Sequence, residues 1–280
     1  MSELPGPIEP TTTPTIGGLY AETFTPAGTP RGVVVITHGY AEHCGRYREV
    51  AHVIVNAGWA ALSYDVRGHG KSPGERGYID RFDTYLTDFA AVQTAARALA
   101  PEGAPMILLG HSHGSLITLR ALASMSPPAN IKAAVVSSPF LGLKLVVPGY
   151  KKVLARVASR VAPKLAQPNS LRVEDLTSDK QKQSERLADK LCFEIATSRW
   201  FTEASAAQDY VYEHASRITV PTTWLVGGAD PIADPARSRS VADKVPGATY
   251  HDLVGLKHEV FNEVERGKVF AKLSHVLASV

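Results

Sequence analysis

Short apolar segments and longer amphipathic segments alternate along most of the chain. The apolar segments are rich in β-branched residues and end at glycine or polar residues, which is typical of strands buried on both faces of a parallel sheet. They cover residues 33–36, 59–64, 106–109, 131–137, 222–227 and 250–254. Apolar positions three and four residues apart predict helices in the intervals, at 47–55, 85–99, 116–122, 235–245 and 259–277. This order predicts an α/β fold with a mostly parallel central sheet and helices on both faces.

The alternation is interrupted once. From Phe140 to about Arg217 the sequence is helix-like and rich in charge, and the strand-helix order resumes at Thr222. We interpret residues 140–217 as a helical cap inserted into a core made of residues 19–139 and 218–280. Residues 1–18, rich in proline and threonine, are expected to form a flexible lead-in. A chain of 280 residues is long enough for one large core with such an insertion.

Composition excludes several classes of protein. Hydrophobic residues make up 44% of the chain and charged residues 20%, which favours a globular protein over a disordered or membrane-spanning one. The net charge of +3 is too small to predict a nucleic-acid partner. Cys44 and Cys192 are far apart and in no metal-ligand spacing, so we expect two reduced thiols, and neither a metal nor a cofactor. The N-terminus lacks the features of a secretory signal, which predicts a cytoplasmic location; no oligomeric state is predicted.

A nucleophile motif follows the strand predicted at 106–109. In Gly110-His111-Ser112-His113-Gly114 the two glycines permit a tight strand-to-helix turn that raises the serine above the sheet. A helix that begins just after the serine also directs its positive dipole end and free N–H groups toward a developing oxyanion. The pattern is short, and a serine in an ordinary turn is the competing interpretation. The strand before it and the helix after it favour Ser112 as a nucleophile.

A serine hydroxyl needs a base to remove its proton, and the chain order serine, acid, histidine in such folds directs the search to later loops. Asp230 directly follows a predicted strand and is the predicted acid, whereas Asp234 precedes Pro235 and has the features of a helix N-cap. His258 follows the last predicted strand and is the predicted general base. His251 lies inside that strand, where packing or surface exposure explains it more simply.

Further motifs accompany these residues. They are His38-Gly39-Tyr40-Ala41-Glu42-His43 with Arg46-Tyr47, Asp65-x-Arg67-Gly68-His69-Gly70-x-Ser72-x-Gly74, Gly77-Tyr78-Ile79, and the pair His258-Glu259. Together, from about Gly32 to the C-terminus, the chain resembles the monoacylglycerol lipase and lysophospholipase group of α/β-hydrolases. The resemblance implies an α/β-hydrolase fold and an oxyanion hole made by the backbone N–H groups of Tyr40 and His113. It also implies a lipid-like ester as substrate.

The chain departs from that group after the serine, where the family usually has methionine and this chain has His113. We expect the imidazole to pack under the cap; an altered pH dependence of the reaction is the alternative. His69, Asp65 and Arg67 are expected to be structural, with an ion pair between Asp65 and Arg67 tying down the glycine-rich loop.

Positive charge is concentrated in the cap, where the lysines and arginines of residues 140–176 outnumber Glu174 and Asp175. The seven basic residues are Lys144, Lys151, Lys152, Arg156, Arg160, Lys164 and Arg172. Apolar residues fall at helical spacing beside them: Val153, Leu154, Val157, Val161 and Leu165, preceded by Val146, Val147 and Tyr150. Such a helix can lie on an anionic lipid surface, and the alternative is an ordinary amphipathic helix packed on the core.

These features predict a serine ester hydrolase for lipid-like carboxylic esters, with a monoacylglycerol as the leading substrate. Within catalysis, a general carboxylesterase, a lysophospholipase or an aminopeptidase-like hydrolase uses the same machinery and is the alternative. A hydrolase fold retained only for binding is a third possibility, which the intact order of serine, acid and histidine disfavours.

Overall fold

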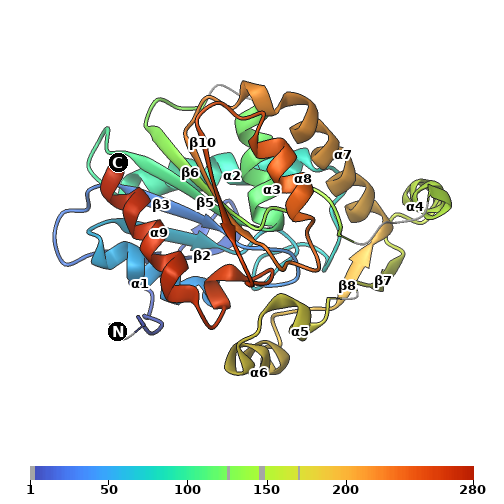
Figure 1. Cartoon of the computed structure of the whole chain (residues 1–280), viewed down its shortest axis with the longest axis horizontal. Helices are drawn as coiled ribbons and strands as arrows, with labels where there is room; N and C mark the ends of the chain where they lie inside the picture. Colours follow the sequence, from blue (N-terminus) through green and yellow to red (C-terminus); the bar gives the residue numbers. More distant parts are fainter. Residues whose placement is uncertain (1–3, 125–126, 145–148, 170) are drawn as a thin grey trace.

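The computed structural model describes residues 4–124, 127–144, 149–169 and 171–280, with the backbone alone for residues 151–153. Its centre is an eight-stranded sheet in the order β1-β2-β4-β3-β5-β6-β9-β10 (Figure 1). The strands are β1 (Thr15–Ile16), β2 (Leu19–Phe24), β3 (Val33–Thr37), β4 (Ala60–Tyr64), β5 (Met106–His111), β6 (Ile131–Ser137), β9 (Thr222–Gly227) and β10 (Ala248–Leu253). From β4 to β10 the neighbours are parallel, while β1 and β2 are antiparallel to their partners. The predicted α/β-hydrolase arrangement of a mostly parallel sheet is confirmed.

All six strands predicted from the sequence are present, and β1 and β2 are additional. The segment expected as a lead-in contributes β1 and a bridge between Thr12 and Thr23. Strand β2 contains Glu22, which is buried and paired with Arg48 at 2.9 Å. A charged residue inside a short strand removes the apolar run on which strand prediction depends.

Helices cover both faces of the sheet, each over its own apolar core. On one face lie α1 (Arg48–Asn56) and α9 (Arg266–Ser279), which contact each other (Figure 1). On the other face lie α2 (Asp83–Ala96), α3 (His113–Ser124) and α8 (Pro235–Ala242), with α7 (Ser198–His214) packed on α3. The described residues also form four short 3₁₀ helices: η1 (Cys44–Tyr47), η2 (Arg97–Leu99), η3 (Ala215–Arg217) and η4 (Val260–Asn262).

The segment predicted as the cap, residues 140–217, begins after β6 and includes helix α7 and the 3₁₀ helix η3. It consists of α4 (Gly149–Val161), β7 (Ala166–Pro168), α5 (Val173–Leu176), α6 (Lys180–Ala188) and β8 (Ile195–Thr197), followed by α7. Helix α4 lies at the outer edge of the molecule, next to α7 (Figure 1). Helix α6 is tied to the core by ion pairs, among them Lys182 to Glu49 at 2.6 Å. Val146 and Val147 of the predicted cap pattern lie outside the described residues, as do the side chains of Lys151, Lys152 and Val153.

Parallel strands end at one edge of the sheet, and this edge collects the loops predicted to carry chemistry. The loops after β3, β5, β9 and β10 contain Tyr40, Ser112, Asp230 and His258, respectively. Ligand sites of open α/β sheets lie outside the carboxyl ends of the strands. The fold therefore brings together residues that are far apart in the sequence.

Candidate active site

Ser112 occupies a sharp turn between strand β5 and helix α3. Its φ is +48°, in the left-handed region that a side chain rarely adopts. The turn is possible because Gly110 and Gly114 lack side chains. A Cβ on Gly110 would lie 2.7 Å from the carbonyl oxygen of Gly114, and a Cβ on Gly114 would overlap the carbonyl oxygen of Thr37. The two glycines of the motif are thus required by close backbone approach, as the sequence interpretation assumed.

Ser112, His258 and Asp230 converge at the carboxyl edge of the sheet. The Nε2 atom of His258 lies 2.9 Å from the hydroxyl oxygen of Ser112, and its Nδ1 atom lies 2.7 Å from Oδ2 of Asp230. All three residues are buried. This geometry allows the imidazole to take the serine proton while the carboxylate holds the opposite ring nitrogen in its protonated form.

Backbone N–H groups fix the carboxylate of Asp230 in this orientation. Its Oδ1 atom accepts hydrogen bonds from the N–H of Ile232 at 2.8 Å and of Ala233 at 3.0 Å, which leaves Oδ2 for His258. Asp234, the alternative acid, instead caps α8 by accepting from the N–H of Ala236 at 3.1 Å. The distinction that the sequence made between the two aspartates therefore matches their contacts.

The pKa values of His258 and of His111, whose rings lie 5.0 Å apart, shift in opposite directions. Burial lowers the pKa of His258, but the charge and hydrogen bond of Asp230 outweigh burial and hold this pKa above its usual 6.5. Burial and the neighbouring His258 lower the pKa of His111 to about 4. His258 is thus the one of the pair suited to accept a proton near neutral pH.

The loop after β3 lies opposite the start of helix α3. The carboxylate of Glu42 accepts a hydrogen bond from the N–H of Gly39 at 2.6 Å. The next residue along this loop is Tyr40. His113 begins helix α3, and the first N–H groups of a helix have no partner within it. The backbone N–H groups of Tyr40 and His113 remain the predicted oxyanion hole.

A cavity of about 740 Å³ opens from Ser112 and His258 toward the cap. Most of its lining is apolar and comes from the cap helices and from the loop after β6, with Leu154, Val157, Phe140, Leu176, Trp200 and Ile232 among the lining residues. Sites of this size and apolar character accommodate one drug-sized or single-chain ligand.

A family model described as serine aminopeptidase S33 matches residues 28–265, which is most of the chain. The chain belongs to this hydrolase family. It is 31% identical over 269 residues to a monoacylglycerol lipase of Mycolicibacterium smegmatis, covering 94% of this chain and 95% of that protein. It is 28% identical to phospholipase YtpA of Bacillus subtilis, covering 87% and 94% of the two chains.

A solved structure agrees with these relatives. The monoacylglycerol lipase of Paleococcus ferrophilus superposes with a TM-score of 0.83 at 29% identity, over 93% of this chain and 98% of that one. The resemblance to the monoacylglycerol lipase group of α/β-hydrolases, inferred from separated motifs, is therefore confirmed, and the chain is a hydrolase of that group.

His113, the residue after the proposed nucleophile, is fully buried in an aromatic cluster. Its ring lies 5.0 Å from that of Tyr85 and 5.5 Å from that of Trp200 in the cap. Burial, with a smaller effect of His38, lowers the pKa of His113 to about 3, so the ring is neutral at physiological pH. The contacts favour the packing interpretation of this imidazole over the pH-dependent one.

The glycine-rich loop after β4 is held differently from the sequence interpretation. Asp65 does not pair with Arg67: its carboxylate accepts hydrogen bonds from the N–H groups of Cys44 at 2.8 Å and Lys71 at 2.6 Å. Arg67 instead forms a two-pronged pair with Asp88 of helix α2, at 2.7 and 2.8 Å. The predicted ion pair is therefore wrong, because backbone donors from the loop itself and from η1 satisfy the Asp65 carboxylate. His69 is buried with a strongly lowered pKa, which agrees with a structural role.

Sequence reasoning gave no role to four charged residues beside the site. Arg46 contacts Glu42 at 2.5 Å and Glu259 at 2.7 Å, and the cap residue Arg186 lies 3.9 Å from Glu259. Glu42, Arg46 and Glu259 were visible only as members of family motifs. Arg46 and Glu259 are 213 residues apart in the sequence, so no local pattern reports their contact.

One cluster has the atoms of a metal site. The side chains of His43, Asp189 and Cys192 offer ligand atoms within 4.8 Å of one another. However, Nδ1 of His43 accepts the N–H of Gly45 at 3.2 Å, so Nε2 carries the proton that it shares with Asp189 at 2.6 Å. The guanidinium of Arg186 also lies 3.5 Å from the sulfur of Cys192. A protonated nitrogen and an adjacent cation both disfavour a metal ion, so the donor set fits a hydrogen-bonded contact between cap and core.

Proposed function

We propose that this hydrolase cleaves lipid-like carboxylic esters, most favourably monoacylglycerols, with Ser112 as nucleophile, His258 as general base and Asp230 as the acid that orients His258. The observation that carries the proposal is the unbroken hydrogen-bond chain from Asp230 through His258 to Ser112, at the base of an apolar cavity. The family membership of the chain supports the same reaction.

The reaction proceeds in two halves. His258 takes the proton of Ser112 as the serine oxygen bonds to the ester carbon, and the oxyanion that forms accepts hydrogen bonds from the N–H groups of Tyr40 and His113. The C–O bond to the alcohol then breaks, and His258 returns the proton to the leaving alcohol. In the second half, His258 removes a proton from water as the water oxygen bonds to the acyl carbon. The acyl–serine bond then breaks, the carboxylic acid leaves, and the proton returns to Ser112.

The cavity supports a substrate with one hydrocarbon chain. Its volume of about 740 Å³ and its apolar lining suit an acyl chain, whose transfer from water is favourable in proportion to the area buried. Relatives at about 30% identity are named monoacylglycerol lipases, and another is named a phospholipase. An ester of glycerol is therefore the leading substrate, and a lysophospholipid is the second.

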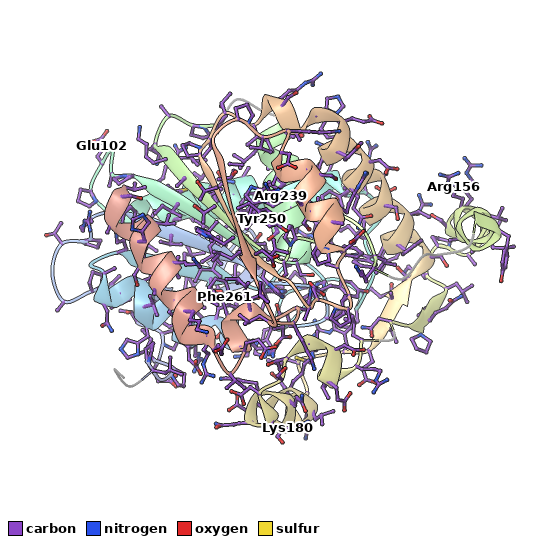
Figure 2. The ribbon with its side chains drawn as sticks, in the orientation of Figure 1. Glu102, Arg156, Lys180, Arg239, Tyr250 and Phe261 are labelled. Carbon is purple, nitrogen blue, oxygen red and sulfur yellow. The ribbon has the colours of Figure 1, made fainter. Side chains whose placement is uncertain are left out.

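Transient contact with a membrane surface is part of the proposal. Helix α4 lies at an outer edge of the molecule and exposes Tyr150, Leu154 and Val161 by 64%, 61% and 77%, respectively. Leu154 and Val161 also line the cavity, so the exposed face of α4 is continuous with the proposed substrate site. Arg156, also exposed on α4, lies at the outer edge of the molecule in Figure 2. Exposed apolar and basic side chains on one helix suit an anionic lipid surface. None of the described helices is both long and apolar enough to span a membrane, and the cytoplasmic location stays a prediction.

A panel of esters tests the proposal. Glycerol, phosphoglycerol and simple alkyl esters of increasing acyl length are compared with aminoacyl amides, using the wild-type chain and Ser112→Ala. We expect hydrolysis that favours medium or long acyl chains on glycerol, and a loss of about 10⁴-fold or more in turnover for Ser112→Ala. A fluorophosphonate probe should label the wild type and not the variant.

The panel also separates the alternatives. Preference for phosphoglycerol esters would make the protein a lysophospholipase, preference for short alkyl esters a general carboxylesterase, and preference for aminoacyl amides an aminopeptidase. If Ser112→Ala kept nearly normal turnover, or was still labelled by the probe, the proposed mechanism would be wrong.

A further inference from the structure

A buried ion cluster lies beside the serine and histidine, and its two glutamates line the same cavity. It consists of Glu42 and Arg46, which lie four residues apart after β3, and Glu259, which follows β10. The Nη1 atom of Arg46 donates to Oε2 of Glu42 at 2.5 Å and to Oε1 of Glu259 at 2.8 Å, and its Nη2 atom donates to Oε2 of Glu259 at 2.7 Å. One guanidinium thus bridges two carboxylates.

Each carboxylate is attached to a different part of the proposed machinery. Oε1 of Glu42 accepts the N–H of Gly39 at 2.6 Å, directly before the amide of Tyr40, and also the hydroxyl of Tyr47 at 2.7 Å. Glu259 directly follows His258, and its own N–H donates to the carbonyl of Leu176 at 2.8 Å. Arg46 therefore connects the proposed oxyanion loop to the loop that carries the general base.

The sheet alone does not set the distance between these two loops. The oxyanion loop follows β3 and the histidine loop follows β10, and β5, β6 and β9 lie between these strands in the sheet. Ser112, at the end of β5, must meet both the Tyr40 amide and the His258 ring. A bridge through side chains is a direct way to hold the two loops on either side of the serine.

The cluster is built for rigidity. Only 10% of the Arg46 side chain is exposed, against 3% for Glu42 and 4% for Glu259. Burial opposes the charge on both carboxyls, but the guanidinium of Arg46 outweighs it and holds the pKa of each well below the usual value, so both are ionised. A planar guanidinium with two parallel bonds to a carboxylate also restricts orientation, which a lysine ammonium does not.

We propose that Arg46 is a positioning residue for ester hydrolysis: it holds the oxyanion loop, through Glu42, and the His258 loop, through Glu259, in register with Ser112. The inference rests on the proposed function of Ser112 and His258. It assigns Arg46 no contact with substrate, so its effect should appear in the chemical steps and not in binding.

The test compares Arg46→Met and Arg46→Lys with a matched control, Arg48→Met. Arg48 also pairs with two glutamates, Glu9 and Glu22, but those lie away from the cluster. For each variant, kcat and KM are measured with the best ester, together with the inhibition constants of a trifluoromethyl ketone and of the matching non-reactive alcohol. The ketone adds to the serine and forms an oxyanion, whereas the alcohol reports ground-state binding alone.

We expect Arg46→Met to lower kcat by about 10- to 10²-fold, somewhat less than the loss of an oxyanion donor. KM and the affinity for the alcohol should change by less than threefold, while the affinity for the ketone falls in parallel with kcat. Arg46→Lys keeps the positive charge but cannot form two parallel hydrogen bonds to one carboxylate, so its loss of kcat should be intermediate. Arg48→Met should retain wild-type values of all four quantities.

Folding is checked by thermal unfolding before the kinetics. If Arg46→Met does not fold, Arg46→Lys and Glu259→Gln decide by the same measurements. Wild-type kcat and ketone affinity in the folded variants, or a loss shared equally by the ketone and the alcohol, would overturn the positioning role. Failure of the proposed function is separately visible, because it would leave Ser112→Ala active.

Discussion

The carboxylates of Asp230 and Asp234 share one loop and serve different partners: Asp230 meets Nδ1 of His258 at 2.7 Å, and Asp234 caps helix α8 through the N–H of Ala236 at 3.1 Å. Proximity in sequence thus conceals two functions. One carboxylate sets the protonation of the proposed general base, and the other stabilises a helix terminus.

This contrast predicts the pH dependence of the reaction. Hydrolysis requires neutral His258, whose pKa Asp230 holds above 6.5, so kcat/KM should decline as pH falls through a value above 6.5. In Asp230→Asn burial acts without the compensating charge, which should move this acid limb to lower pH, while the maximal kcat falls by about 10⁴-fold.

Asp234→Asn is the control, because asparagine also caps helices. It should retain the wild-type pH profile and nearly the wild-type kcat in a titration of kcat/KM from acid to neutral pH. An acid limb that stays in place in Asp230→Asn would contradict the assignment of this limb to the Asp230–His258 pair.

The serine turn predicts an intolerance to added side-chain volume. A Cβ on Gly114 would overlap the carbonyl oxygen of Thr37 and lie 2.5 Å from that of His38, both of which are backbone atoms. Gly114→Ala should therefore lose about 1–3 kcal/mol of the free energy of unfolding and most of its turnover. Gly28→Ala, at a glycine with nothing within 4 Å of its Cβ position, should match the wild type in denaturant unfolding and in ester hydrolysis. Equal behaviour of the two variants would argue against the tight turn.

Replacing His113 is expected to stabilise the folded protein. Both ring nitrogens of this buried histidine lack a hydrogen-bond partner within the described part of the chain. Methionine, the residue that the resemblance implies at this position, buries no such groups, so His113→Met should raise the free energy of unfolding by about 1 kcal/mol or more. The pH profile of kcat/KM should be unchanged, since His113 is neutral with a pKa of about 3. A shifted acid limb, measured alongside urea unfolding, would instead restore the pH-dependent interpretation.

Helix α4 predicts binding to anionic vesicles that weakens with salt. Arg156→Gln combined with Arg160→Gln should reduce the free energy of partition onto phosphatidylserine-containing vesicles by about 1 kcal/mol per residue. The control pair is Arg239→Gln with Lys268→Gln, on helices α8 and α9, away from α4 (Figures 1 and 2). Binding is measured by vesicle sedimentation. If both pairs of substitutions weaken binding equally, the effect comes from the net charge of the protein, and α4 is not the membrane contact.

Much of the fold could be predicted from local sequence, because buried parallel strands are continuous apolar runs and the helices between them carry one apolar face. Strand β2 was missed because Glu22 interrupts its pattern, and its partner Arg48 comes from a helix later in the chain. The short cap strands β7 and β8 were missed for a related reason: three residues are too few to establish a period.

The sequence by itself determined the type of chemistry: a serine between two glycines at a strand end, followed by an aspartate and a histidine after later strands. It also separated Asp230 from Asp234, since capping depends on adjacent residues. Tertiary structure alone decided that Asp65 is satisfied by backbone N–H groups, that Arg67 binds Asp88, and that His113 packs among aromatic rings. The same holds for Arg46, whose two glutamates are brought together only by the folded sheet. Hydrogen bonds and ion pairs act over a few ångströms in space, so the partners of a charged side chain are known only when the whole chain has folded.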